Sequence, residues 1–160
     1  GEAQFLQDCE AAGVYGLIIP DLPFELAEQF KQRFENRKVK IISLIAMTAS
    51  NDRIQHIAEH AEGFIYTVTM NATTGDNGGF HPELKNKIAL IKEQADVPVV
   101  AGFGIRTKAQ VAEVAGFADG VVIGSEIVKR FAEDDIASIR QYLQGIRAAL
   151  NESEEKAELK

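Results

Sequence analysis

The sequence predicts an α/β fold in which helices cover a parallel sheet, and two patterns support this prediction. Short apolar runs rich in Val and Ile alternate along the chain with longer amphipathic segments, which is the order of repeated βα units. The apolar runs are also nearly continuous, as in strands that pack against helices on one face and against other strands' side chains on the other. We therefore expect one domain made of successive βα units.

Five strands and six helices follow from these runs. The strands are expected at residues 14–20, 40–45, 63–69, 97–101 and 120–123. The helices are expected at residues 1–12, 24–36, 51–60, 82–95, 107–116 and 134–150. Three helices have start signals. Ser50 or Asp52 can cap the helix at 51–60, Thr107 can cap the helix at 107–116, and Pro82 suits the first turn of the helix at 82–95.

The composition excludes several classes of protein. The chain has 160 residues, with 24 acidic against 17 basic residues and a net charge of −7, which argues against a nucleic-acid partner. No apolar run approaches the roughly 20 residues needed to cross a bilayer, and the first residues do not resemble a signal peptide. We expect no membrane association and a cytoplasmic protein. Cys9 is the only cysteine, which excludes an intrachain disulfide, and we expect it to be a small buried hydrophobe.

Residues 1–150 are expected to form the folded domain. The remaining residues, 151–160, are mostly Glu and Lys with one Leu, and we expect them to form a disordered, charged tail.

Two successive strands run directly into small residues at their carboxyl ends. Gly102 and Gly104 follow one strand, and Gly124 and Ser125 follow the next. In phosphate-binding barrels, the loop after the seventh strand and a short extra helix after the eighth donate backbone N–H groups to one phosphate. Glycine allows the backbone to approach the anion, and Ser125 would add a hydroxyl at a helix amino terminus. The alternative is that these glycines only make tight turns and that Ser125 is an ordinary N-cap.

The predicted phosphate site implies a barrel, but the number of strands is too small for a closed one. A (β/α)8 TIM barrel has eight strands and about 250 residues, whereas this chain has five predicted strands and begins with a helix. We therefore expect the carboxy-terminal part of a TIM barrel of the ribulose-phosphate-binding type, with the three amino-terminal units missing.

Five linked segments resemble the tryptophan synthase α chain family in order and spacing. They are residues 18–25 with the sequence IIPDLPFE, residues 64–67 with FIYT, residues 73–75 with TTG, residues 102–105 with GFGI, and residues 124–129 with GSEIVK. The resemblance covers nearly the whole chain to about Leu150. Met70-Asn71-Ala72 departs from the Ser-Arg-type segment that is common in the family.

The resemblance implies an activity, the retro-aldol cleavage of indole-3-glycerol phosphate to indole and glyceraldehyde 3-phosphate, with no cofactor. It implies that the phosphate is held by four residues, Gly75, Gly104, Gly124 and Ser125. It further implies that Tyr66 lines the indole-glycerol side of the pocket, and that Thr74 and Gly75 belong to a loop, residues 71–80, that closes over the substrate.

The resemblance also implies a partner, the β subunit of an α2β2 tetramer, with Asp21 positioning active-site loops near the subunit contact. The family's catalytic Glu and Asp would lie upstream of Gly1. We therefore expect no catalytic residue in this chain and no activity of the chain alone.

Several of these residues have simpler interpretations. Asp21 can make a turn and cap the next helix, and Tyr66 can be a strand tyrosine with its hydroxyl at a barrel end. His56 and His60 lie four residues apart on one predicted helix with no third ligand nearby in the sequence, so we interpret them as a solvated face and expect no metal site.

Two other functions remain open. Other phosphate-binding barrel enzymes, such as sugar-phosphate isomerases and cyclases, share the paired glycine strand ends, although the DLPFE and TTG segments favour the first family. A non-enzymatic five-stranded module of the flavodoxin-like or receiver kind would explain five strands without missing units. A receiver would need Lys after its last strand, where this chain has Gly124 and Ser125.

Overall fold

The computed structural model describes residues 1–69, 80, 83–102 and 104–158. Within these residues every strand pairing is parallel, as expected. The strands are β1 (Gly16–Leu17), β2 (Lys40–Ile41), β3 (Ser43–Ala46), β4 (Ile65–Val68), β5 (Val99–Gly102) and β6 (Gly120–Val122). One sheet has the order β1-β2 and the other β3-β4-β5-β6. The predicted strand 40–45 is therefore divided at Ile42, whose N–H donates to the carbonyl of Leu17 over 2.9 Å.

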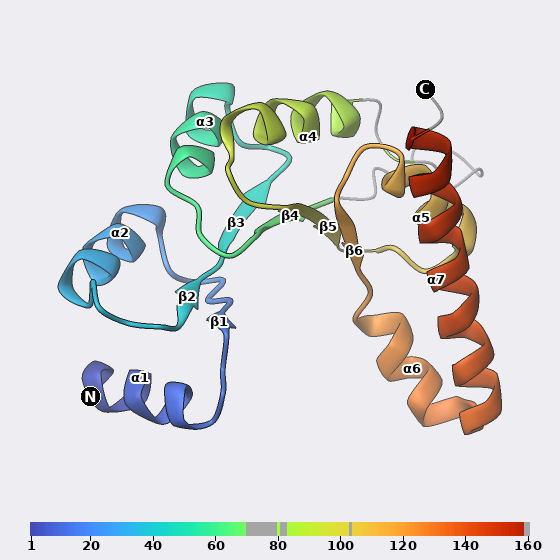
Figure 1. Cartoon of the computed structure of the whole chain (residues 1–160), viewed down its shortest axis with the longest axis horizontal. Helices are drawn as coiled ribbons and strands as arrows, with labels where there is room; N and C mark the ends of the chain where they lie inside the picture. Colours follow the sequence, from blue (N-terminus) through green and yellow to red (C-terminus); the bar gives the residue numbers. More distant parts are fainter. Residues whose placement is uncertain (70–79, 81–82, 103, 159–160) are drawn as a thin grey trace.

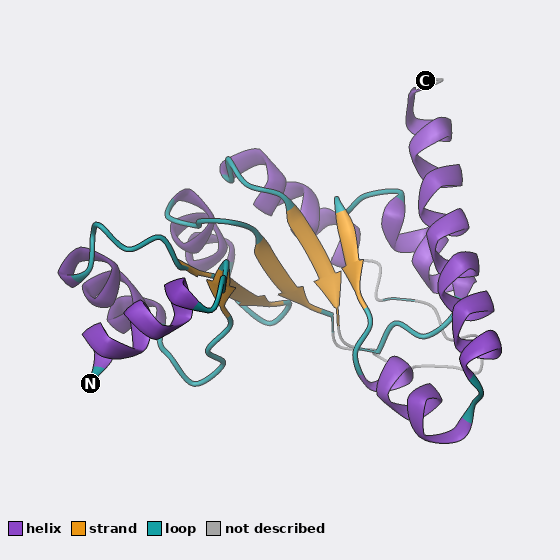
Figure 2. Cartoon of the chain, turned by 60° about the horizontal axis from the view of Figure 1, so that its bottom comes forward, coloured by secondary structure: helices purple, strands orange, loops and turns teal. Residues whose placement is uncertain are grey.

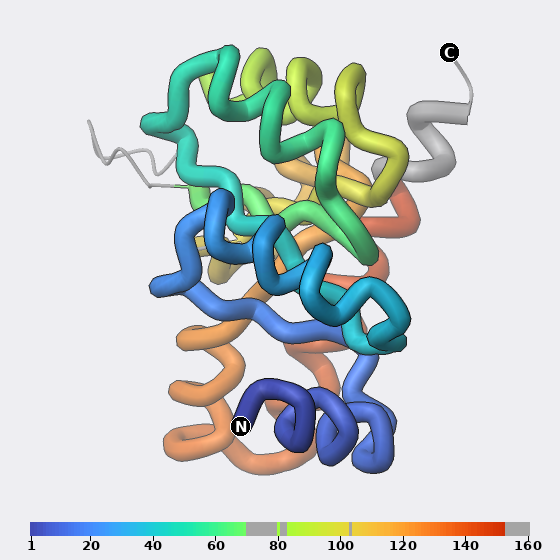
Figure 3. The backbone as a smooth tube through the Cα atoms, turned by 90° about the vertical axis from the view of Figure 1, so that its left-hand side faces the viewer, coloured from blue at the N-terminus to red at the C-terminus, as the bar shows by residue number. Residues whose placement is uncertain are grey.

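The helices are arranged around these strands in chain order. They are α1 (Glu2–Ala11), α2 (Phe24–Arg33), α3 (Asn51–Glu59), α4 (Glu83–Gln94), α5 (Lys108–Ala115), α6 (Ser125–Glu133) and α7 (Ile136–Glu158). Figure 1 shows them as an arc from α1 over α3 and α4 to α7, with the strands inside it. Figure 2 shows the same strands side by side, and Figure 3 shows α1, α2 and α3 one above the other. The arrangement is that of a partial α/β barrel.

One face of the larger sheet is buried beneath the helices. Ile45, Thr67 and Ala101 are register partners on neighbouring strands, and each has no exposed surface. Ile45 and Ala101 belong to the same core as Ile88 and Ile91 of α4, which are also fully buried. The opposite face includes Leu44, Tyr66 and Val100, which are only half-buried. We call this half-buried face the inner face.

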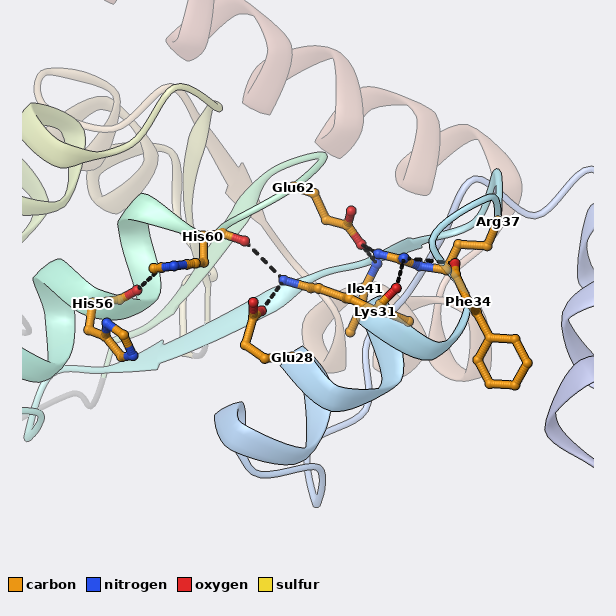
Figure 4. Close-up of polar contacts among 8 residues, drawn as sticks. All are labelled: Glu28, Lys31, Phe34, Arg37, Ile41, His56, His60 and Glu62. Carbon is orange, nitrogen blue, oxygen red and sulfur yellow. Dashed lines mark hydrogen bonds and ion pairs between the residues drawn. The ribbon is translucent and has the colours of Figure 1, made fainter.

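The amino-terminal units have a smaller core and a polar connection to the rest of the chain. Leu6 and Cys9 of α1 are buried against Val39, so the expected burial of Cys9 is confirmed. Arg37 forms an ion pair with Glu62, whose carboxylate also accepts a 2.6 Å hydrogen bond from the N–H of Ile41 (Figure 4). The Arg37 side chain is 7% exposed, so this pair is largely removed from solvent and links the segment before β2 to the segment before β4.

Helix starts follow the predicted signals. The Ser50 hydroxyl accepts from the N–H of Arg53 at the start of α3. Thr107 and Gln110 form a reciprocal capping box at the start of α5. Pro82 lies outside the described residues. The expected cap by Asp21 is wrong, because the N-cap of α2 is Pro23, with no side-chain cap.

The last two helices differ from the prediction. The segment after β6 forms α6, a helix that is not among the six expected from the apolar runs. The predicted phosphate site nevertheless requires a helix that starts at Ser125. Helix α7 continues to Glu158, so its expected end at residue 150 is wrong. Glu, Lys and Ala favour helix, and the segment Asn151–Glu158 contains neither glycine nor proline to end it. No described helix is long and apolar enough to cross a membrane.

The open arc leads to a prediction about association. In the described residues β1 pairs only with β2 and β6 only with β5, so each has an unpaired edge. Apolar side chains are exposed in the segments that follow both strands, including Ile18 at 45% and Val128 at 70%. Because unpaired edges and apolar patches favour association, sedimentation velocity should show the average mass of the 160-residue chain rising with concentration. A compact monomer at every concentration would contradict this expectation.

Candidate phosphate site at the carboxyl edge of the sheet

Four strands of the larger sheet end side by side. Ala46, Val68, Gly102 and Val122 are consecutive register partners, so the residues that follow them emerge at one edge, which we call the carboxyl edge. The predicted site residues Gly104, Gly124 and Ser125 all follow these strand ends. Parallel pairing thus brings the two glycine segments to neighbouring positions, as the sequence predicted. Thr74 and Gly75 lie outside the described residues.

Tyr66 occupies the inner face just below the carboxyl edge. Its register partner is Val100, two residues before Gly102. A Cβ atom added to Gly102 would collide with the Tyr66 hydroxyl and lie 2.6 Å from the ring carbon that bears it. Gly102 therefore provides the space that the tyrosine ring uses, and loss of hydration at this position raises the pKa of the Tyr66 phenol. A neutral hydroxyl is available here as a hydrogen-bond donor.

The loop after β5 is anchored on both sides of Gly104. Before it, the Gly102 carbonyl accepts the Thr69 N–H over 2.9 Å and the Thr69 hydroxyl over 2.6 Å. After it, the Ile105 side chain is buried in the core with 3% exposure. Gly104 itself has φ +82°, a conformation that side chains rarely adopt. Gly104 thus occupies a backbone conformation that favours glycine, between two anchored residues.

Helix α6 begins at the same edge. Gly124 is its N-cap and Ser125 its first residue, and both are exposed. A Cβ atom on Gly124 would meet no atom of the described residues within 4 Å. The first N–H groups of a helix and its dipole favour a bound anion. The structure therefore has the predicted helix start at Ser125, but by itself a helix start does not identify a ligand.

Tyr142 of α7 connects the two glycine segments. Its hydroxyl donates to the Arg106 carbonyl over 2.9 Å, two residues beyond Gly104. Its ring lies 4.0 Å from the guanidinium carbon of Arg130, which belongs to α6. Arg130 in turn pairs with Glu126 at 2.9 Å and Asp134 at 3.0 Å. One side chain thus contacts both the loop after β5 and the helix after β6.

The remaining predicted residues lie elsewhere. Asp21 is exposed in the turn after β1, where the Leu22 N–H donates to the Ile19 carbonyl over 3.1 Å. This confirms the turn, although not the helix cap. His56 on α3 and His60 at its C-cap are exposed as expected, but Glu59 completes a group of three possible ligands with them. The prediction that His56 and His60 have no third possible ligand nearby in the sequence is therefore wrong.

Sequence reasoning missed two contacts at this edge. The space beside Gly102 is filled by Tyr66, which lies 36 residues earlier in the chain. The Arg106 carbonyl accepts from Tyr142, which lies 36 residues later. Neither pair has a local signal, since both depend on strand register and on the packing of α7 against α5. The side of the sheet on which Tyr66 lies had a sequence signal, since the family resemblance implied the pocket side, and Tyr66 is half-buried between the buried Ile65 and Thr67.

The role of Tyr142 can be tested by removing one oxygen atom. Tyr142→Phe keeps the ring beneath Arg130 but leaves the Arg106 carbonyl without its donor. We expect the free energy of unfolding to fall by about 0.5–1.5 kcal/mol and amide exchange in residues 104–107 to accelerate. Tyr15→Phe is the matched control, because Tyr15 is 64% exposed. Equal exchange rates in both variants would show that Tyr142 does not hold the loop.

Comparison with known proteins identifies the family. The family model described as tryptophan synthase alpha chain matches residues 1–158. The tryptophan synthase alpha chain of Staphylococcus carnosus is 72% identical over 157 residues, which are 98% of this chain and 63% of that relative. That of Staphylococcus saprophyticus is 65% identical over 151 residues, 94% of this chain and 63% of the relative.

A solved structure gives the same result for the fold. The tryptophan synthase subunit alpha from Campylobacter jejuni superposes with a TM-score of 0.80 at 29% identity, over 91% of this chain and 59% of that one. The chain thus spans about 63% of the length of the curated relatives it matches. With a family match over residues 1–158, the chain belongs to the tryptophan synthase alpha chain family.

Proposed function

We propose that this chain supplies the phosphate-binding part of an active site that cleaves indole-3-glycerol phosphate to indole and glyceraldehyde 3-phosphate. The observation that supports the proposal most is the meeting of the Gly104 loop and the start of α6 at one edge, in a chain of this family. The proposed reaction is a lyase step of tryptophan biosynthesis, for which the cytoplasm is the expected location.

In this proposal the phosphate is held mainly by the backbone. N–H groups of the Gly104 loop and of the first turn of α6 donate to the phosphate oxygens, and the Ser125 hydroxyl adds one donor. Gly75 contributes a further backbone contact and Thr74 belongs to the closing loop, as the family resemblance implies. Fixing the phosphate positions the rest of the substrate along the inner face toward Tyr66, whose neutral hydroxyl can donate a hydrogen bond.

The cleavage itself requires groups that this part of the molecule is not proposed to supply. Breaking the carbon–carbon bond between the indole ring and the glycerol chain needs a base to take the proton of the adjacent hydroxyl. It also needs an acid that delivers a proton to the ring carbon. By resemblance, these are the family's Glu and Asp, expected upstream of Gly1. The residues described above bind and orient the substrate.

We further propose that the partner is a tryptophan synthase β subunit, with the turn around Asp21 near the contact. Asp21 is exposed and lies in the turn after β1. Membership of the family does not favour the two alternatives, another phosphate-binding barrel enzyme or a five-stranded module.

The first prediction of this proposal concerns phosphate affinity in a barrel completed with the amino-terminal units. Gly124→Leu should weaken glycerol 3-phosphate binding most clearly, because Gly124 has a negative φ and open space, so the new side chain meets the ligand first. Gly104→Leu should also weaken it, although part of the loss would come from strain at φ +82°. Ser125→Ala should cost less, roughly tenfold in affinity, since it removes one hydroxyl donor to a charged group.

Calorimetric titration measures these affinities, and circular dichroism confirms that each variant is folded. Gly124→Ala is the size control and should fall between the wild type and the leucine variant. If folded Gly124→Leu bound glycerol 3-phosphate as tightly as the wild type, the start of α6 would not be part of the phosphate site.

The second prediction concerns the 160-residue chain alone. It should release no detectable indole from indole-3-glycerol phosphate, because each positioned acid or base typically contributes about 10² to 10⁴ in rate. Mixing with an amino-terminal segment that contains the family's Glu and Asp should restore activity. A rate near that of an intact α chain, measured on this chain alone, would refute the assignment of catalysis to the upstream residues.

A further inference from the structure

The end of α3 has a cluster of possible metal ligands that the proposed function does not use. His56, Glu59 and His60 are all exposed, and one ligand atom from each lies within 4.8 Å of the others. From this arrangement we propose that the three side chains bind one divalent transition-metal ion of the zinc class. The site is on the outer surface of the molecule, and its test does not depend on the proposed function.

The helical spacing explains why the three side chains converge. Residues at positions i, i+3 and i+4 lie on the same face of a helix, which is the relation among His56, Glu59 and His60. The two imidazole centroids are 5.0 Å apart. A tetrahedral zinc ion with zinc–nitrogen bonds of about 2.0–2.1 Å would hold two imidazole centroids roughly 5 Å apart. The rings are therefore already at the separation that chelation requires.

The orientation of His60 also suits a ligand. Its Nδ1 lies 2.9 Å from the His56 carbonyl, so this nitrogen is the one that carries a proton and donates it (Figure 4). Metal-binding histidines usually donate their second ring nitrogen to a carbonyl or carboxylate, which fixes the ring and its tautomer. The Nε2 lone pair of His60 then remains for a metal ion.

The His56 ring is held from the side by helix α2. The Phe24 ring contacts it edge-on, with centroids 4.9 Å apart and an interplanar angle of 65°. Phe24 also lies 6.0 Å from the His60 ring. A ring packed against both imidazoles restricts their rotation, and less entropy is lost when a metal binds.

The surrounding charges leave the site accessible to a cation. Lys31 donates to the His60 carbonyl over 2.9 Å, but it is also paired with Glu28 at 2.7 Å. Arg53, one turn before His56, forms an ion pair with Glu25 that lowers the pKa of that carboxyl to about 2. Each of these cations thus has its own carboxylate.

Glu59 adds a negative charge to the site itself. One of its oxygens accepts from the Gln55 amide over 2.9 Å, and the other can bind a metal. Two imidazoles and one carboxylate suit zinc, copper, nickel or cobalt, whereas magnesium and calcium prefer oxygen ligands. Three protein ligands leave at least one coordination position for water or for a group from another molecule.

The location separates this site from the candidate phosphate site. In a βα unit the helix runs back antiparallel to its strand, so the last turn of α3 lies at the end opposite the carboxyl edge. Metal binding here should therefore leave glycerol 3-phosphate affinity unchanged in the completed barrel.

The test is calorimetric titration of the 160-residue chain with zinc chloride in a buffer that does not bind zinc. We expect one ion per chain, with affinity reduced at least tenfold in His56→Asn and in His60→Asn, and less in Glu59→Gln. All three positions are exposed, so circular dichroism should show unchanged folding. His81→Asn is the matched control, since His81 is the chain's third histidine, and magnesium chloride is the ion control.

A second measurement identifies the ligands directly. Nitrogen NMR of the imidazoles should show zinc-dependent shifts for His56 and His60 and none for His81. The proposal would be overturned by wild-type zinc affinity in both His56→Asn and His60→Asn, by equal loss in His81→Asn, or by the absence of measurable zinc binding.

Discussion

In-register parallel pairing of β3, β4, β5 and β6 is the constraint on which the candidate phosphate site depends. Each strand contributes only a few residues, yet pairing aligns Ala46, Val68, Gly102 and Val122 at one edge. A shift of one residue in any pair would move every side chain of that strand to the opposite face. Tyr66 would then point into the helix-covered core, and a buried residue such as Thr67 would face inward. The burial of the helix-covered face therefore maintains the register that places Tyr66 on the inner face.

Polar groups stabilise the carboxyl edge where the apolar core ends. The hydroxyls of Thr67 and Thr69 donate to the carbonyls of Val100 and Gly102, over 2.8 and 2.6 Å. Both threonines are almost fully buried, so a threonine without its acceptor would leave an unsatisfied hydroxyl. These bonds connect the end of β4 to the end of β5 just before the Gly104 turn. The turn consequently begins from a fixed backbone rather than from a frayed strand end.

How far the sequence could predict this structure depended on the distance over which each signal acts. The capping box of Thr107 and Gln110, the cap by Ser50 and the start of α6 at Ser125 are local, and each was visible from residues within one turn. The order of the five βα units was also predictable, because apolar runs alternate with amphipathic segments. The ends of the elements were less predictable. The division of one strand at Ile42 depends on tertiary packing, and the length of α7 depends on a helix preference that declines only gradually along the chain.

Contacts between distant segments had no sequence signal. The space that Gly102 leaves for Tyr66 requires the register of β4 against β5. The hydrogen bond from Tyr142 to Arg106 requires α7 to lie along α5. The apolar pattern of α7 indicates which face of the helix is buried, but it does not indicate which residue Tyr142 contacts. By contrast, the grouping of Glu59 with His56 and His60 is local, because positions i, i+3 and i+4 share one face of a helix.

The two proposed binding regions differ in what holds their ligands, and this difference follows from their places in the fold. At the carboxyl edge the proposed donors are mainly backbone N–H groups, positioned by strand register, by the buried Ile105 and by Tyr142. Such a site has little side-chain freedom to lose when the anion binds, and it tolerates sequence change wherever the turn and the helix start are kept. At the end of α3 the ligands are exposed side chains, positioned only by one helical turn and by Phe24. There a single substitution removes a ligand, whereas at the carboxyl edge only a change that blocks or distorts the backbone removes the site.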